Sequence, residues 1–308
     1  MTWHELPYRG PFDLAASTRF LEGFAPAARP DAAARPRELR LAFPAAPSWR
    51  PVGVLVQQPA PDGPVRARVF AEPSDVDSVL AHVRRMLSLD VDGSELAEVG
   101  ARDPVVGELL ARYPGLRPTG FHSPYEAACW AIIGHRIRMT TAAGIKQRLA
   151  ERFGVPVDVA GERLVSFPAP DALPDRVPLV SEVKSDRLHA IARAALDGRL
   201  DAAELRALPI ADALARLREL PGIGPFSAEL ILLRGAAHPD GFPTAESRLH
   251  DEMTAAYGLT DPSGADLAAV ADGWRPYRTW VSLLLRTRRE ADTGEIATGR
   301  RIRRSVAS

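Results

Sequence analysis

The segment Leu220-Pro-Gly-Ile-Gly-Pro-Phe-Ser-Ala228 carries residue types that can bind a phosphate group. Gly222 and Gly224 can adopt backbone angles that a Cβ would forbid, and neither places side-chain bulk in the turn. Pro225 fits the first turn of a following helix, where its missing N–H costs nothing. The free N–H groups and the positive dipole at such a helix start favour an anion. The chemistry expected here is therefore main-chain binding of a phosphate.

Two segments with helical periodicity flank this turn and must position it. Residues 211–219 and 226–233 each repeat apolar side chains at helical spacing, with charged residues between them in the first segment. Two helices joined by so short a Gly-containing turn form a helical hairpin. On the turn alone, an ordinary connection between two helices of a helical domain explains the pattern equally well.

Residues 105–290, which contain the hairpin, are predicted to be nearly all-α. Ser123-Pro-Tyr-Glu126 has the residues of a helix start with a capping box, and Gly134 is expected to end this helix, which is apolar nearly all round. The residues that follow form a loop, and the next helix is predicted over 141–153. Further helices are predicted at residues 184–196, 201–207, 263–272 and 276–290.

Residues 1–90 show strand signals instead. Apolar and polar residues alternate over 39–43 and 65–69, and residues 52–56 form a short apolar run. Residues 75–87 have the amphipathic pattern of a helix. The sequence thus predicts an α+β amino-terminal domain, with a small antiparallel sheet and helices, followed by a mainly α domain.

Composition bounds the class of protein. The 308 residues suit one large or two medium domains, and 46% apolar content is ordinary for a globular chain. The single cysteine, Cys129, excludes an intramolecular disulfide and a four-cysteine metal or iron–sulfur site within the chain. No charge-poor apolar run approaches the ~20 residues that span a bilayer, and the N-terminus lacks the pattern of a signal peptide. We therefore expect a soluble cytoplasmic protein without a membrane partner.

Charge gives no global support for nucleic-acid binding, because 39 basic residues balance 39 acidic ones. The distribution is uneven, however. Arginines concentrate over residues 286–304, and residues 291–308 are predicted to be a basic, mobile tail. Most cationic residues are Arg, which pairs with phosphate in a bidentate manner that Lys cannot match. A local basic face that binds nucleic acid therefore remains an open interpretation.

Several segments, taken together, resemble the helix-hairpin-helix DNA glycosylases of the 3-methyladenine DNA glycosylase II type. Leu220 to Ala228 resembles their hairpin, and residues 234–249 resemble the Asp-x-(aromatic)-Pro-x-x-Asp-x-x-Leu segment that follows it. The other similar segments are residues 6–13 with 20–21, 122–134 with 150–154, and 274–280. The resemblance covers roughly residues 1–290 in the family's order and implies the family's fold.

The resemblance implies a monofunctional glycosylase. Endonuclease III and its relatives place a lysine in the hairpin for Schiff-base chemistry, whereas the aligned position here is Phe226, which cannot be that nucleophile. Many of those enzymes also carry a four-cysteine cluster. The implied activity is hydrolysis of the N-glycosidic bond of an alkylated, 3-methyladenine-like base flipped out of duplex DNA, in base excision repair. No cofactor is required for this chemistry.

The family's catalytic aspartate aligns with Glu246, which follows Gly224 by 22 residues as the family pattern requires. A carboxylate there would stabilise the positive charge that builds on the sugar as the bond breaks. Glu is one methylene longer than Asp, so its carboxylate reaches ~1.3–1.5 Å further, a shift to which catalytic geometry is sensitive. Alternatively, Glu246 only stabilises the N-terminus of a helix through the helix dipole. Asp240 and Asp251 are then the reserve candidates for the catalytic carboxylate.

The resemblance also assigns DNA contacts. In the family, a side chain from the loop after the first core helix fills the gap left by the flipped base, and this position falls on His135 or Arg136. A solvated loop histidine is an equally good interpretation of His135. The predicted DNA-binding residues are His135, Arg136, Gly222, Ile223, Gly224, Pro225, Phe226, Ser227 and Ala228.

A base pocket and a cation site are implied as well. Phe226 could line the pocket or belong to the hairpin core, and Arg286 falls where this branch tends to place a pocket Trp. An Arg there would oppose a cationic base. A monovalent cation would be held beside the DNA phosphate by the main-chain carbonyls of Arg218, Leu220 and Ile223. The aromatic residues of 274–280 lie at helical spacing, and core packing is favoured over base stacking for them.

Three hypotheses about function follow. The first is a monomeric glycosylase that acts on double-stranded DNA. The second is a non-catalytic relative that recognises damaged DNA with the same hairpin, since Glu246, Arg136 and Arg286 depart from the family's pattern. The third is a helical interaction protein that no longer binds DNA, for which zero net charge is the support.

Overall fold

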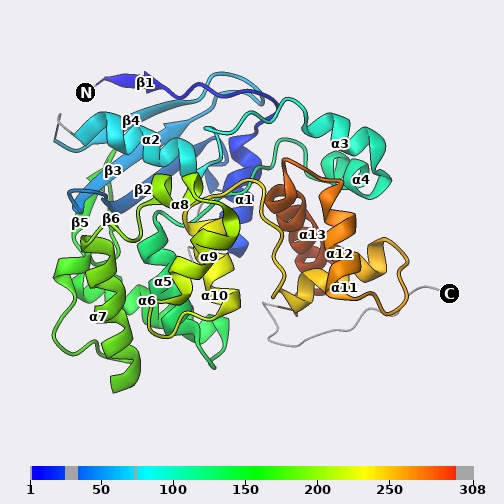
Figure 1. The fold of residues 1–308 in the computed structure, drawn as a ribbon. Coiled ribbons are helices and arrows are strands. Elements are labelled where there is room, and N and C mark those ends of the chain that lie inside the picture. The colour runs from blue at the N-terminus through cyan, green and yellow to red at the C-terminus, as the bar shows by residue number, and fades with distance from the viewer. Residues whose placement is uncertain (1, 25–33, 73–74, 296–308) are drawn as a thin grey trace.

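The computed structural model describes residues 2–24, 34–72 and 75–295 (Figure 1). Its amino-terminal part contains a four-stranded antiparallel sheet in the order β1-β4-β3-β2. The strands are β1 (Trp3–Glu5), β2 (Glu38–Ala45), β3 (Arg50–Gln57) and β4 (Arg66–Phe70). Apolar residues pair directly across β2 and β3, as in Leu41 with Val54 and Phe43 with Val52. The predicted antiparallel sheet is confirmed, with the short edge strand β1 added to it.

Helices α1 (Leu14–Gly23) and α2 (Val76–Met86) pack on this sheet. Asp13 caps α1, because its carboxylate accepts from the Ala15 N–H at 3.0 Å. The buried side chains of the two helices and of β2, β3 and β4 form one apolar core. The predicted α+β amino-terminal fold is therefore confirmed, while the boundaries at residues 90 and 105 remain a prediction.

The second part is mainly helical and is centred on α5 (Pro124–Gly134), which is buried on all sides. Ser123 accepts from the Glu126 N–H at 3.1 Å, as a capping box requires. The Glu126 carboxylate does not return this bond to Ser123; it accepts from His122 N at 3.0 Å instead. Around α5 lie α6 (Met139–Phe153), α7 (Glu182–Leu196), α8 (Ala202–Ala207), α9 (Ile210–Arg218) and α10 (Pro225–Leu230).

A β-hairpin interrupts the region predicted to be nearly all-α, and this prediction was wrong there. Strands β5 (Pro156–Val159) and β6 (Glu162–Val165) pair with each other and pack against the amino-terminal sheet. A Cβ added at Gly53 would lie 2.6 Å from Val159 Cγ2 and 2.9 Å from Val157 Cγ1, so glycine permits this close approach. Each strand has four residues, too few for a clear alternation pattern.

A further lobe contains α3 (Leu96–Arg102), α4 (Pro104–Arg112), α11 (Ser247–Ala256), α12 (Gly264–Asp272) and α13 (Arg278–Thr293). In Figure 1 the helices α11 to α13 lie to the right of α5, α9 and α10. Trp274, Tyr277 and Trp280 are buried in the core of this lobe, which confirms the core-packing interpretation.

The basic stretch that begins at Arg286 is not an exposed face over its first residues. Arg288 and Arg289 are buried on α13; Arg288 Nε pairs with Glu252 at 2.7 Å and Arg289 Nη2 with Glu295 at 2.8 Å. Of the predicted tail, residues 296–308 lie outside the described residues. Within the described part of the chain, no helix combines the length and the apolar character needed to cross a bilayer.

Candidate functional site

The helical hairpin forms at the predicted position. Helix α9 ends at Arg218 and α10 begins at Pro225. Between them Gly222 has φ +84°, and Ile223 N donates to the Leu220 carbonyl at 3.0 Å. Gly224 is extended and precedes Pro225 as the N-cap of α10. The turn therefore uses the positive φ expected of glycine at Gly222 alone, whereas Gly224 adopts extended angles open to any residue.

The two glycines make different demands on a side chain, and we expect Gly222→Ala and Gly224→Ala to separate folding from DNA binding. A Cβ at Gly222 would lie 2.7 Å from Arg187 Cδ and 3.0 Å from Ile132 Cδ1, whereas the space at Gly224 is open. Gly222→Ala should cost about 1–2 kcal/mol, because φ is positive there. Gly224→Ala should keep the thermal midpoint but weaken DNA affinity severalfold, since its methyl group would stand where a phosphate approaches. Thermal unfolding and fluorescence anisotropy with duplex DNA measure the two effects. Equal DNA affinity in Gly224→Ala and the wild type would contradict main-chain phosphate binding at this turn.

A cavity of about 650 Å³ opens between α10 and α13. Five residues singled out by the sequence line it, namely His135, Phe226, Ser227, Glu246 and Arg286. Its other walls include residues of α1 and α5, such as Phe20 and Trp130. The volume is in the range of small-molecule sites, so a flipped base would fit inside. The fold thus brings the proposed carboxylate, the pocket position and part of the hairpin to one site.

Glu246 is bound to Arg286 inside this cavity. The Arg286 Nε atom lies 2.9 Å from Glu246 Oε1, and the two side chains are 16% and 25% exposed. Glu246 is the N-cap of α11, yet its side chain makes no capping hydrogen bond. Among the described residues, the Arg286 Nη1 atom is buried and has no hydrogen-bond partner. The carboxylate is therefore held by a neighbouring cation and stays reachable from the cavity.

A second cation, Arg234, was not identified from the sequence. It lies on the π-helix η5 (Ile231–Gly235) directly after α10. Its guanidinium packs over Phe24, with 4.6 Å to the ring centroid, and donates to the Thr119 carbonyl at 2.8 Å. Burial lowers the pKa of Arg234 to about 10, while the charge of Glu246 raises it. The Glu246 carboxylate therefore interacts with two arginines: it forms an ion pair with Arg286, and its charge also acts on Arg234.

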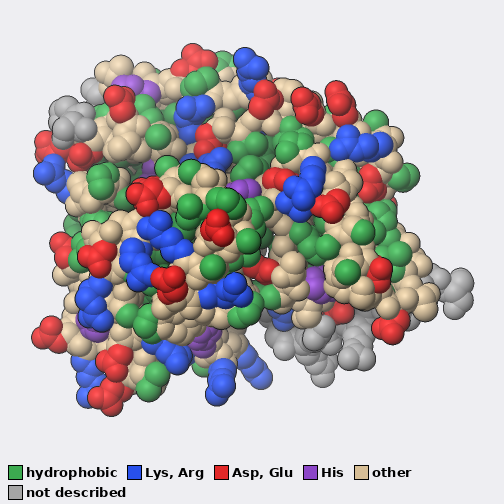
Figure 2. Space-filling view, in the orientation of Figure 1, with side chains coloured by type: hydrophobic (Ala, Val, Ile, Leu, Met, Phe, Trp, Pro, Cys, Tyr) green, Lys and Arg blue, Asp and Glu red, His purple; other side chains and the backbone are tan. Residues whose placement is uncertain are grey.

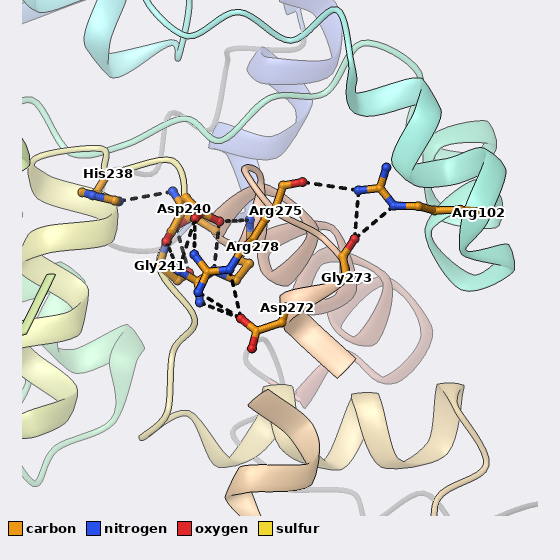
Figure 3. A network of polar contacts seen from close by, with 9 residues as sticks. Arg102, His238, Asp240, Gly241, Asp272, Gly273, Arg275 and Arg278 are labelled. Atoms are coloured by element: carbon orange, nitrogen blue, oxygen red, sulfur yellow. Dashed lines mark hydrogen bonds and ion pairs between the residues drawn. The ribbon is translucent and has the colours of Figure 1, made fainter. Parts of the chain in front are cut away.

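The reserve carboxylates are engaged elsewhere. Figure 3 shows Asp240 between Arg275 and Arg278, both of which bind its carboxylate at 2.9 Å. Asp251 pairs with Arg289 at 3.6 Å. Neither aspartate lines the cavity. Within the described structure, the geometry favours Glu246 over both reserves for chemistry in this cavity.

The loop after α5 carries the two residues expected to face the gap left by a base. Arg136 is exposed and has φ +57°, whereas His135 lies partly buried at the cavity wall, with Nε2 3.4 Å from Ser227 Oγ. Burial lowers the pKa of His135, and the charges of Lys184, Arg187 and Arg136 lower it further. Three cations therefore place positive charge near this loop although the chain is neutral overall. Figure 2 shows Arg and Lys side chains toward the lower left, interspersed with acidic ones.

The hairpin residues divide into two groups. Phe226 is 50% exposed and lines the cavity, which favours the pocket interpretation over hairpin core. Ile223 and Ala228 are buried in the helical core, so only their main chain could reach DNA. Ser227 is buried as well, but it faces the cavity.

Comparisons with known proteins add an independent observation. Residues 4–123 match the family model of the AlkA N-terminal domain. The chain is 23% identical over 216 residues to a Bacillus subtilis protein named DNA-3-methyladenine glycosylase, covering 68% of this chain and 71% of that protein. It is 29% identical over 237 residues to a Mycobacterium tuberculosis protein named probable bifunctional transcriptional activator/DNA repair enzyme AlkA. That match covers 75% of this chain but 46% of the relative, so less than half of the mycobacterial protein is represented.

The fold has a solved counterpart. The structure titled 3-methyladenine DNA glycosylase from Archaeoglobus fulgidus superposes with a TM-score of 0.77, covering 95% of this chain and 99% of that one at 19% identity. At this identity the likeness concerns the fold, and it extends over the sheet, the hairpin and the carboxyl-terminal helices alike.

Proposed function

We propose that this chain, a helix-hairpin-helix glycosylase of the AlkA type by its amino-terminal domain, its relatives and its fold, hydrolyses the N-glycosidic bond of a damaged base flipped out of duplex DNA. The observation that carries the proposal is the position of Glu246 beside the hairpin, in a cavity large enough to hold a base. The first substrate class to test is the alkylated, 3-methyladenine-like bases, because relatives bear that name.

The residues around the cavity fit the steps of this reaction. The hairpin main chain from Gly222 to Pro225 would hold the DNA backbone, and the exposed ring of Phe226 would pack against the flipped base. As the glycosidic bond breaks, positive charge builds on the sugar, and the Glu246 carboxylate would stabilise it and orient a water. Arg136 or His135 would fill the gap in the duplex.

The hairpin also bears on strand cleavage. Phe226 occupies the place where a lysine would form a Schiff base, and its ring cannot do so. We propose hydrolysis without lyase activity. A methylated duplex incubated with the protein should then break only after alkali treatment, because the abasic product keeps its strand intact. Strand breaks without alkali would contradict this part of the proposal.

A monovalent cation at the hairpin belongs to the same proposal. Ile223 N already occupies one lone pair of the Leu220 carbonyl, which leaves the second for a cation. The carbonyls of Arg218, Leu220 and Ile223 would supply the ligands, and the ion would place positive charge next to a DNA phosphate. DNA affinity measured in potassium and in tetramethylammonium chloride at equal ionic strength tests this site.

Arg286, which forms an ion pair with Glu246, would repel a cationic base in this cavity. We expect Arg286→Leu to accelerate release of a cationic alkylated base by at least tenfold relative to release of the neutral base hypoxanthine. One positive charge removed at roughly 7 Å is worth about 2 kcal/mol at an effective dielectric constant near 20. Single-turnover rates on duplexes carrying each base measure the ratio.

The matched control is Arg19→Leu. Arg19 lines the same cavity, but it is exposed and makes no ion pair with Glu246. It should leave the ratio unchanged. A similar change of ratio in both variants would show that Arg286 acts by its bulk or by the general charge of the cavity, not through Glu246.

The second candidate function is a non-catalytic module that recognises damaged DNA. The specific observation in its favour is the same ion pair, because Arg286 neutralises the carboxylate that would have to stabilise the sugar. Base release from methylated duplex DNA separates the two candidates. A steep decrease of DNA affinity with salt would support both of them against an interaction protein that does not bind DNA.

A further inference from the structure

Glu229 is a buried carboxylate that lines the same cavity as Glu246, but the base-release chemistry described above gives it no part. It lies on α10, the second helix of the hairpin, and is 6% exposed. Its Oε1 atom accepts from the Thr244 N–H at 2.9 Å and from the Thr244 hydroxyl at 2.5 Å. Its Oε2 atom accepts from the Ala245 N–H at 3.0 Å. Both oxygens therefore bind the two residues that immediately precede Glu246.

The other end of this loop is held by a separate set of contacts. Arg275 and Arg278 bind the Asp240 carboxylate (Figure 3). The Gly241 N–H donates to the Thr279 hydroxyl at 3.0 Å, and this hydroxyl donates to the Gly241 carbonyl at 3.0 Å. The segment 240–245 is thus attached to the start of α13 at one end and to α10 at the other.

The position of Glu246 depends on these attachments. Its backbone is non-helical, with φ −95° and ψ 88°, and its side chain makes no capping bond that would fix it to α11. A buried carboxylate is costly unless its oxygens accept enough hydrogen bonds, and Glu229 accepts three, all from this loop. Helix α10 starts at the Gly224–Pro225 turn and carries Glu229. One helix therefore connects the proposed phosphate contact to the loop that precedes Glu246.

We infer that Glu229 is a positioning residue that sets the place of the Glu246 carboxylate relative to the hairpin. The inference rests on the proposed function, because it assigns to Glu246 the stabilisation of the sugar cation. Catalytic geometry is sensitive to displacements of about 1 Å, which can cost about a hundredfold in rate. A change at Glu229 should therefore lower the rate of base release and leave duplex binding by the hairpin intact.

The test variant is Glu229→Gln, which keeps the size of the side chain. Its amide can accept from the Thr244 N–H, but its NH₂ group would face the Ala245 N–H, so one of the three bonds becomes a donor–donor contact. We expect a ten- to hundredfold lower single-turnover rate on methylated duplex DNA, with the Kd for that duplex within about twofold of the wild type. Thr244→Val removes only the hydroxyl bond and should have a smaller effect.

The control is Glu204→Gln, the same substitution on α8, where the exposed Glu204 side chain pairs with Arg216 at 3.2 Å. It should leave both quantities unchanged. Thermal midpoints of all variants are measured in parallel. A rate loss in Glu229→Gln that only follows the fraction of unfolded protein would overturn the positioning role.

A binding readout keeps the inference testable without turnover. A carboxylate placed at the sugar should make the protein prefer a duplex with a cationic pyrrolidine abasic analogue over one with neutral tetrahydrofuran. Glu229→Gln should reduce that preference at least fivefold. If the wild type releases no base yet shows a preference that Glu229→Gln reduces, the proposed activity fails and the positioning role stands. A preference that is absent in the wild type, or that is equal in the variant, overturns it.

Discussion

Glu246→Gln should lower the single-turnover rate of base release from methylated duplex DNA by about 100- to 1,000-fold. The amide keeps the shape of the side chain and can still accept from Arg286 Nε, which lies 2.9 Å from Oε1 in the wild type. It removes the negative charge that would stabilise the sugar cation. DNA affinity should stay within about twofold, because the hairpin and the loop after α5 are untouched. Quantified base release, with anisotropy on the same duplex, measures both effects.

Two companion variants sharpen this result. Glu246→Asp withdraws the carboxylate by ~1.5 Å and should give an intermediate rate, because charge is kept while reach is lost. Asp251→Asn is the control, since Asp251 lies outside the cavity and pairs with Arg289 at 3.6 Å. Equal release by Glu246→Gln and the wild type would move the catalytic assignment to Asp240, or to Asp251 if Asp251→Asn lowers release. No release by any of them, with tight DNA binding, would favour the non-catalytic module.

The parts of the fold that could be predicted are those with local causes. The hairpin turn depends on Gly222, Gly224 and Pro225 within four residues, and the start of α5 depends on Ser123 and its proline neighbour. Strands of the amino-terminal sheet could be predicted because apolar and polar residues alternate along them. In each case the pattern and the physical cause occupy the same short stretch of chain.

The site could be predicted only in part, because its contacts join distant residues. Spacing and resemblance pointed to Glu246 and to Arg286 separately, but nothing in the sequence shows that they bind each other across the cavity. The role of Glu229 depends on the fold bringing α10 against residues 244–245. From the sequence, Asp240 and Glu246 are both plausible catalytic carboxylates. Only the placement of Arg275 and Arg278 commits Asp240 to a structural network.

Arg117→Leu should destabilise the protein by about 3–5 kcal/mol. The Arg117 side chain is 1% exposed and donates to the carbonyls of Pro11 and Ser88 at 2.9 Å and of Val91 at 3.0 Å, and also to the Arg9 carbonyl. Burial lowers its pKa to about 10, so it stays protonated at neutral pH. Leucine would remove this donor from the carbonyls of Pro11, Ser88 and Val91, while the Arg9 carbonyl would keep the Gly93 N–H at 3.0 Å. Chemical denaturation and the thermal midpoint measure the loss.

Arg102→Leu is the matched control for Arg117→Leu. Arg102 also donates to main-chain carbonyls, those of Gly273 and Arg275, but it does so at the exposed surface (Figure 3). It should cost less than about 1 kcal/mol, because water can replace the guanidinium. The Arg117 guanidinium also packs over Trp280 of α13, at 5.1 Å from the ring centroid, so it connects the amino-terminal segments to the helix that carries Arg286. Equal losses in the two variants would mean that water reaches the carbonyls around Arg117, and that this connection does not hold α13 in place.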